Sequence, residues 1–96
     1  MTGSTRSSNG LDDRRKRVLF RCWHRGTREM DLILGRFADA ELGGLAELEL
    51  VQFENLISLE DPALYAAFAG DGVIPEEHLT PLYHRIRTFR NLGALA

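Results

Sequence analysis

Three histidines, one cysteine and a few serines are the residues of this sequence that could perform nucleophilic or acid-base chemistry. Cys22 and His24 are the closest pair, but residues two apart on a helix point away from each other and cannot act as nucleophile and base. His78 and His84 lie on other segments, and most of the serines fall within the first eight residues. The sequence therefore predicts no catalytic site, and we expect that the protein is not an enzyme.

Neither a metal site nor a phosphate-binding loop is predicted. His78 directly follows Glu76 and Glu77, and adjacent residues on a helix do not converge on one ion. The Gly70-Asp71-Gly72 stretch lacks the preceding strand and the G-x-G-x-x-G spacing with which a dinucleotide loop is built. We expect no metal, and no cofactor that this chain binds tightly.

The most distinctive charged stretch runs from Arg25 to Asp31. It places Gly26 between two segments of helical pattern, and glycine tolerates the left-handed backbone with which helices often end. Arg25, Arg28, Glu29 and Asp31 crowd around this glycine. From the residues alone, the stretch is either a well-capped helix junction or a surface built to meet a partner.

Composition limits what the rest of the chain can be. Its 96 residues are 44% hydrophobic and 27% charged, which is ordinary for one globular domain with a modest core. The net charge of -2 gives no general attraction to nucleic acid. The basic residues gather in the first 40 positions, whereas positions 37 to 84 contain no Lys or Arg. A single cysteine cannot form an intramolecular disulfide, which favours a reducing compartment.

Apolar spacing of three and four residues, with no segment of period two, predicts an all-α fold: a compact bundle of about five helices and no sheet. We expect residues 1–10 to form a disordered tail and residues 11–96 a single helical domain. The expected helices cover residues 12 to 24, 27 to 41, 45 to 59, 61 to 70 and a last helix that starts near Pro75 to Glu77. The alternative start for the last helix has Thr80 as its N-cap and Pro81 at its first position.

Other caps and core faces follow from the same patterns. Asp12 or Asp13 should cap the first helix and Asp61 the fourth. Gly35 inside the second helix predicts a close helix crossing, because glycine there costs about 1 kcal/mol relative to alanine. The expected core residues of the second, third and last helices are Met30, Ile33, Leu34, Phe37 and Ala38, then Leu45, Phe53, Leu56 and Ile57, then Leu79, Leu82, Ile86 and Phe89.

Some residues allow more than one interpretation. Cys22 is expected to be a small core residue, and Trp23 either lies at the edge of the core or anchors a partner. Leu48, Leu50 and Val51 make the third helix apolar on more than one side, which favours deep burial over a docking surface. The arginines of the first helix are expected to face water. An acidic protein partner and, with less support, nucleic acid are the alternatives for this basic face.

The stretch Arg25-Gly26-x-Arg28-Glu29-x-Asp31 resembles the R-G-x-x-E signature of the flavin-assembly factors of succinate dehydrogenase. Further residues follow in the order of that family: a basic first helix ending in Val18-Leu19-Phe20, then Phe53, Leu56-Ile57, Asp61-Pro62 and Leu64. Five positions alone are a weak signature. In a chain this short, with the Asp-Pro helix start about 35 residues downstream, the resemblance is fairly specific.

The resemblance implies a five-helix chaperone. Members of the family bind the flavoprotein subunit of succinate dehydrogenase, and often its fumarate reductase relative, and promote covalent attachment of FAD to a histidine of that subunit. FAD would belong to the client protein. By match to the motif, Arg25, Gly26 and Glu29 are expected to contact the client, with Arg28 and Asp31 as weaker members.

The rival interpretation is a small helical binding module of another class, antitoxin-like or associated with nucleic acid through the basic first helix. On the assembly-factor interpretation we expect no nucleic-acid partner and no membrane insertion, since no apolar run reaches the roughly 18 residues of a membrane span. We expect a monomer when free and a bacterial cytoplasmic location, with the mitochondrial matrix as the less favoured alternative.

Overall fold

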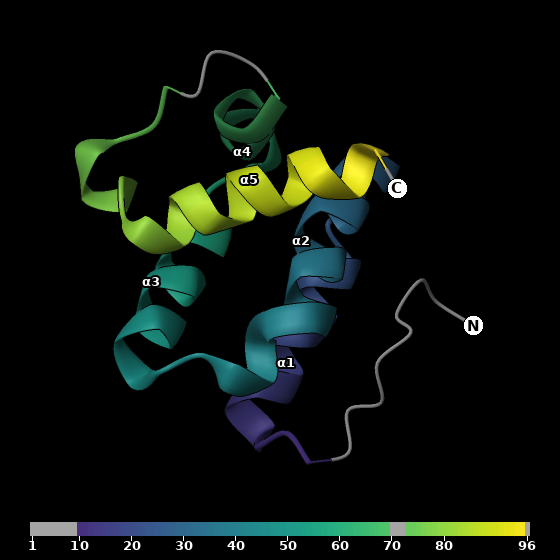
Figure 1. Ribbon diagram of the computed structural model, residues 1–96, viewed down its shortest axis with the longest axis vertical. Helices are drawn as coiled ribbons and strands as arrows, with labels where there is room; N and C mark the ends of the chain where they lie inside the picture. The colour runs from purple at the N-terminus through teal and green to yellow at the C-terminus, as the bar shows by residue number, and fades with distance from the viewer. Residues whose placement is uncertain (1–9, 70–72, 96) are drawn as a thin grey trace. The chain divides into compact units, whose positions relative to one another are not determined.

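The computed structural model describes residues 10–69 and 73–95 of the chain (Figure 1). Within these residues the regular structure is five α-helices and two short 3-10 helices, without a strand, so the predicted all-α class is confirmed. The chain forms two compact parts, which divide between Ala46 and Glu47. The predicted tail, apart from Gly10, and the Gly70-Asp71-Gly72 stretch lie outside the described residues. The single domain over residues 11–96 stays a prediction.

The first part is built from α1 (Asp13–Trp23), α2 (Arg28–Glu41) and the 3-10 helix η1 (Leu42–Gly44). Asp12 caps α1 as predicted, because its carboxylate accepts a hydrogen bond of 3.0 Å from the Arg15 backbone N–H. Thr27 caps α2, since its Oγ1 accepts from the Met30 N–H at 3.3 Å. Both caps satisfy backbone donors that the first turn of a helix leaves without an intrahelical partner.

Trp23 and Gly35 bring α1 and α2 into close contact. The Trp23 indole lies against Gly35, where a Cβ atom would overlap with the Cδ2 and Cε2 atoms of the ring. The indole Nε1–H also donates to Asp39 Oδ1 at 3.2 Å. The predicted close crossing at Gly35 is therefore confirmed, and Trp23, with 8% of its surface exposed, lies at the edge of the core.

Arg15 connects the start of α1 to the end of α2, so the two helices run antiparallel. Its Nε donates to the Leu42 carbonyl at 3.2 Å and its Nη2 to the Leu45 carbonyl at 2.6 Å. Its Nη1 also pairs with Asp12 Oδ2 at 3.2 Å. The expectation that the arginines of α1 all face water is wrong for Arg15, which supplies donors to carbonyls at a helix end.

The buried apolar side chains of the first part come from both helices and from the segments that flank them. They are Leu11, Val18, Leu19, Cys22, Trp23, Met30, Ile33, Leu34, Phe37, Ala38, Leu42 and Leu45. All the core residues predicted for the second helix are among them. Cys22 is fully buried, which confirms its interpretation as a small core residue.

The second part contains α3 (Glu47–Ile57), α4 (Asp61–Ala69), the 3-10 helix η2 (Glu76–His78) and α5 (Pro81–Leu95). The favoured start of the last helix, near Pro75 to Glu77, is wrong. Thr80 Oγ1 accepts from the Tyr83 N–H at 3.1 Å, so Thr80 is the N-cap and Pro81 the first helical residue. Proline needs no N–H at that position and disfavours helical backbone in the residue before it, which separates η2 from α5.

Three smaller predictions are also wrong. The Glu60 carbonyl accepts from the Leu64 N–H at 3.0 Å, so Asp61 is the first helical residue of α4 and not its N-cap. Leu79 lies before α5 and is 47% exposed, because the shortened helix leaves it outside the apolar face. The expected deep burial of the apolar excess of α3 is confirmed for Leu50, which is fully buried, and wrong for Leu48, which is 67% exposed.

Tyr83 and Arg87 of α5 hold the end of α4. The Tyr83 hydroxyl donates to the Ala67 carbonyl at 2.6 Å, and Arg87 Nη1 reaches the same carbonyl at 3.3 Å. An ion pair of 2.8 Å between Arg85 and Glu49 links α5 to α3. The buried apolar residues of this part are Leu50, Phe53, Leu56, Ile57, Leu64, Ala67, Phe68, Leu82, Tyr83 and Ile86.

The contact between Trp23 and Gly35 predicts that Gly35→Ala destabilises the protein. Alanine raises helix propensity by about 1 kcal/mol, but overpacking a close contact costs about 1 to 3 kcal/mol, so we expect a net loss of about 1 kcal/mol. The measurement is urea unfolding followed by the fluorescence of Trp23. Gly44→Ala is the matched control, because a Cβ atom there meets nothing within 4 Å. A Gly35→Ala protein as stable as the wild type would contradict the prediction.

Candidate functional site

The Arg25–Asp31 stretch, called the charged corner below, forms the connection between α1 and α2 and the first turn of α2. Gly26 has φ +104, a conformation that residues with a Cβ atom rarely adopt. A Cβ atom at Gly26 would meet nothing within 4 Å. Glycine is therefore required here by the backbone conformation and not by lack of space.

Asp31 closes the charged corner from the side of α2. Its Oδ1 accepts a hydrogen bond of 2.7 Å from the backbone N–H of Arg25, across the turn at Gly26. Both residues are half-buried, and a hydrogen bond to a carboxylate is roughly twice as strong as one between neutral groups. Together with the Thr27 cap, this bond fixes the connection at both of its ends.

Arg28 and Glu29 are exposed in the first turn of α2. Neither side chain makes a hydrogen bond or an ion pair with another of the described residues. Opposite charges thus stand side by side toward solvent on a backbone that its neighbours hold in place. The structure brings all five predicted site residues together, and their role in partner binding stays a prediction.

A shallow depression lies beside the charged corner. Its lining residues are Trp23, His24, Gly26, Thr27, Arg28, Asp31 and Leu32. His24, Thr27 and Leu32 are not among the site residues predicted from the sequence. A threonine directly before a helix is a recognised N-cap signal and could have identified Thr27. Spacing alone does not show that His24 of α1 and Leu32 of α2 meet at one surface.

Cys22 is unsuited to nucleophilic chemistry. Burial raises the pKa of its thiol to about 12, more strongly than the nearby Arg25 and Arg21 lower it. The reactive thiolate is therefore suppressed. His24, exposed nearby, places its Nδ1 2.7 Å from the Phe20 carbonyl of its own helix and makes no pair with Cys22.

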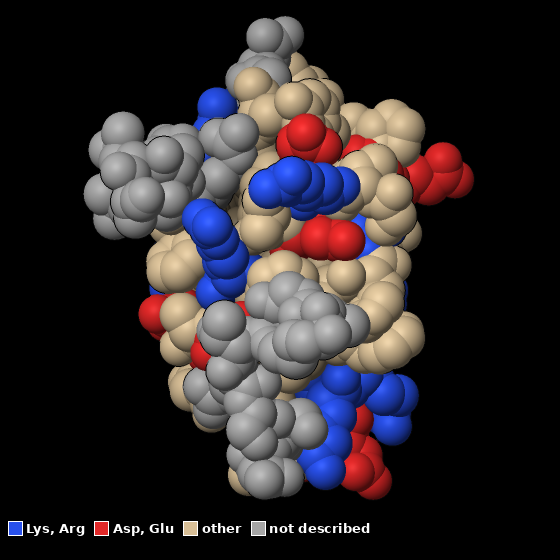
Figure 2. Space-filling model, turned by 90° about the vertical axis from the view of Figure 1, so that its right-hand side faces the viewer, with Lys and Arg blue, Asp and Glu red and all other residues tan. Residues whose placement is uncertain are grey.

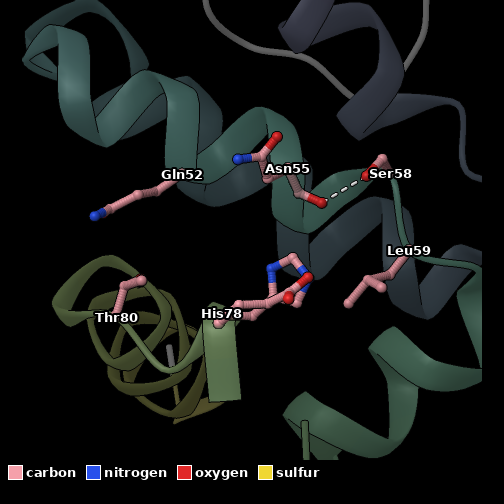
Figure 3. A pocket seen from close by; sticks show the side chains of 7 residues that line it. Gln52, Asn55, Ser58, Leu59, His78 and Thr80 are labelled. Atoms are coloured by element: carbon pink, nitrogen blue, oxygen red, sulfur yellow. Dashed lines mark hydrogen bonds and ion pairs between the residues drawn. The ribbon is translucent and has the colours of Figure 1, made fainter. Parts of the chain in front are cut away.

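A second, smaller pocket lies in the part of the chain after Glu47. Figure 3 shows His78 directed from η2 toward Asn55 and Ser58 of the α3 end, with the Ser58 hydroxyl donating to the Asn55 carbonyl at 2.6 Å. His78 is 9% exposed, and its Nε2 lies 3.5 Å from Glu77 Oε2. One buried imidazole beside an exposed carboxylate does not make a catalytic pair, so this pocket is not the candidate site.

Residues 10–69 and 73–95 hold neither a metal-binding cluster nor a helix that could span a membrane. They contain no group of three or more His, Cys, Asp or Glu side chains that could hold a metal ion. No helix formed by them is long and apolar enough to cross a membrane. The described residues thus form a small helical protein whose distinctive surface feature is the charged corner.

Comparison with known proteins identifies the family. The family model described as the flavinator of succinate dehydrogenase matches residues 16–90, which include the whole charged corner. The chain belongs to this family. The resemblance of the R-G-x-x-E motif is thereby confirmed, and so, for the family, is the prediction of an assembly factor and not an enzyme.

Relatives from bacteria and from mitochondria match the chain. It is 36% identical to the FAD assembly factor SdhE of Acetobacter pasteurianus over 83% of this chain and 73% of the relative. It is 40% identical to that of Legionella pneumophila strain Paris over 80% and 96% of the two chains. The mitochondrial succinate dehydrogenase assembly factor 2 of Dictyostelium discoideum is 31% identical over 73% of this chain and 50% of its own. No solved structure matches the chain.

The bond across Gly26 predicts different stabilities for two carboxylate variants. Asp31→Ala leaves the half-buried Arg25 N–H without its partner and should lower the free energy of unfolding by about 1 to 3 kcal/mol. Glu29→Ala is the matched control in the same helix turn, where only the dipole contribution of about 0.3 to 1 kcal/mol is lost. Thermal and urea unfolding of both proteins measure the difference. Equal losses in the two variants would rule out a structural role for the Asp31 bond.

Burial of Cys22 predicts a protected thiol. In the folded protein, a disulfide reagent at about pH 8 should react at a small fraction of the rate seen in denaturant. The pKa is raised from its ordinary 9.0 to about 12 on folding, so stability is unaffected below about pH 9 and falls as the pH rises toward 12. Absorbance of the released thiolate measures the reaction. Rapid labelling without denaturant would contradict the burial.

Proposed function

We propose that this protein binds the flavoprotein subunit of succinate dehydrogenase and promotes covalent attachment of FAD to that subunit. The observation that carries the proposal is the family match over residues 16–90, with the R-G-x-x-E motif in place. Relatives named as FAD assembly factors in two bacteria support it. A related mitochondrial protein is named for succinate dehydrogenase assembly.

The bond-forming chemistry belongs to the client protein and its flavin. Cys22 is protonated and buried, and the other candidate groups of the chain form no catalytic constellation in the described residues. The protein acts by binding the client conformation in which histidine and flavin lie in position to react. Binding energy then shifts the client toward that conformation and raises the reaction rate by proximity.

The charged corner is the proposed docking site for the client. Gly26 is exposed and carries no side chain, so a partner can approach the backbone closely. Arg28 and Glu29 present opposite charges side by side next to this approach, which fixes the orientation of the partner. Arg25 and Asp31 contribute through the bond that fixes the turn, which lowers the entropy lost on binding.

Further properties follow from the same proposal. FAD is held by the client, and this chain binds no cofactor tightly. We expect a protein that is monomeric when free, has no nucleic-acid partner and works in the bacterial cytoplasm, where the similarity to bacterial SdhE proteins supports a bacterial setting.

The proposal predicts that Glu29→Ala slows covalent flavin attachment without unfolding the protein. The client flavoprotein is produced with each variant, denatured and examined for in-gel flavin fluorescence. We expect a loss of about tenfold in initial rate, equivalent to about 1.4 kcal/mol of lost binding to the productive client. Glu76→Ala is the matched control, an exposed carboxylate in the first turn of η2, and should match the wild type.

Gly26→Arg provides a second variant. It combines an unfavourable backbone conformation with a bulky charge at the point of closest approach. It should therefore abolish the promotion of covalent FAD attachment by this protein. Covalent flavin that is the same with wild type, with the variants and without the protein would refute the proposed function. If wild type and both corner variants raise covalent flavin equally, only the docking site is refuted.

A further inference from the structure

One face of α1 is not explained by the packing of its helix pair. Its exposed residues recur at intervals of three and four, which places them in one stripe opposite the buried Val18, Leu19, Cys22 and Trp23. The stripe consists of Asp13, Lys16, Arg17, Phe20, Arg21 and His24. Around Phe20 the stripe carries the cations Lys16, Arg17 and Arg21. Figure 2 shows exposed Lys and Arg side chains, beside Asp and Glu side chains, at the lower end of the view.

Phe20 is the unusual member of the stripe. It is a large apolar side chain that is 62% exposed, and its neighbours on this face of the helix are charged. The His24 ring stacks on it with centroids 3.9 Å apart and an interplanar angle of 14°. His24 Nδ1–H donates to the Phe20 carbonyl at 2.7 Å, which orients the imidazole for this stacking. An exposed aromatic ring is therefore held in one orientation before any partner arrives.

The cations around Phe20 are available to a partner. Lys16, Arg17 and Arg21 are exposed and form no ion pair with any described residue. The stripe is also continuous with the charged corner, because His24 lines the depression beside Gly26. A partner that occupies the corner can reach His24 and Phe20 along the same surface.

We propose that the exposed face of α1 is a second contact for the flavoprotein client, with Phe20 as its anchor. This inference rests on the proposed function and extends the docking site from the corner along the helix. Aromatic residues are enriched among the few that dominate binding energy, and a ring already oriented loses little entropy on binding. The surrounding cations require a client surface that is acidic around an apolar recess.

The test compares single variants in binding to the purified flavoprotein subunit. Phe20→Ala should weaken binding by about tenfold or more, as expected when an anchor residue is truncated. Phe20→Tyr keeps the ring and should bind like the wild type. Leu48→Ala is the matched control, because Leu48 is similarly exposed at 67% but lies on α3, and its removal should leave affinity unchanged.

His24 and the cations have separable effects. His24 is a positioning residue, so His24→Ala should weaken binding less than Phe20→Ala and should add little when both changes are combined. The double variant Arg17→Gln and Arg21→Gln should slow association and flatten its dependence on salt, because exposed charges act mainly on the rate of encounter. Association rates over a salt series measure both.

Each outcome has one meaning. If wild type neither binds the flavoprotein nor raises covalent flavin, the proposed function fails, and this inference fails with it. If wild type binds and Glu29→Ala weakens binding while Phe20→Ala does not, only this inference is overturned. A large fall in melting temperature for Phe20→Ala would place the ring in the protein's own core and overturn it too. Retention on DNA that depends on Arg17 and Arg21, with client binding unchanged, would also overturn it.

Discussion

The contact of one indole ring with one glycine controls the first part of this protein. Trp23 is the last residue of α1, and it can lie across Gly35 only because no side chain stands there. The two helices are thereby held close, and four residues must carry the chain from one to the other. A turn that tight requires the positive φ of Gly26, and the carboxylate of Asp31 then bonds back across it. The charged corner is thus a consequence of helix packing.

This dependence separates two kinds of residue within one short motif. Gly26 and Asp31 determine the path of the backbone, whereas Arg28 and Glu29 extend from it toward solvent. Loss of a residue of the first kind alters the surface by deforming it. Loss of a residue of the second kind removes a charge from a surface that otherwise keeps its form. The Arg25–Asp31 stretch therefore combines residues that determine the backbone with residues that present charge to solvent.

The sequence predicted most of the fold, because each helix carries its own signals. Asp12, the stripe from Met30 to Ala38 and Gly35 all act through local spacing, and the structure agrees with them. The prediction of where α5 starts was wrong because two local signals competed. The preference of proline for the first helical position, at Pro81, outweighed the apolar spacing that would include Leu79. The prediction that Arg15 faces water was wrong for another reason. Its partners lie at Leu42 and Leu45, and no pattern along the chain shows that an arginine will meet carbonyls 27 and 30 residues away.

The candidate site likewise combines features that adjacent residues predict with features that depend on the three-dimensional structure. The motif residues could be chosen because they are adjacent, and the span matched by the family model contains all of them. The Asp31 bond to Arg25, six residues apart, and the stacking of His24 on Phe20 depend on where helices end and how side chains turn. A helical spacing of four makes the ring contact feasible, but many such pairs in helices never stack.

The Tyr83 hydroxyl on the Ala67 carbonyl has a consequence for how this family can vary. That carbonyl lies in the last turn of α4, where the backbone has no intrahelical donor of its own. Since α5 supplies the donor, this carbonyl is satisfied by a side chain 16 positions further along the sequence. Doubling the length of a connecting loop costs only about 0.6 kcal/mol. Insertions and deletions between α4 and α5 should therefore accumulate among relatives, while an aromatic hydroxyl at position 83 persists.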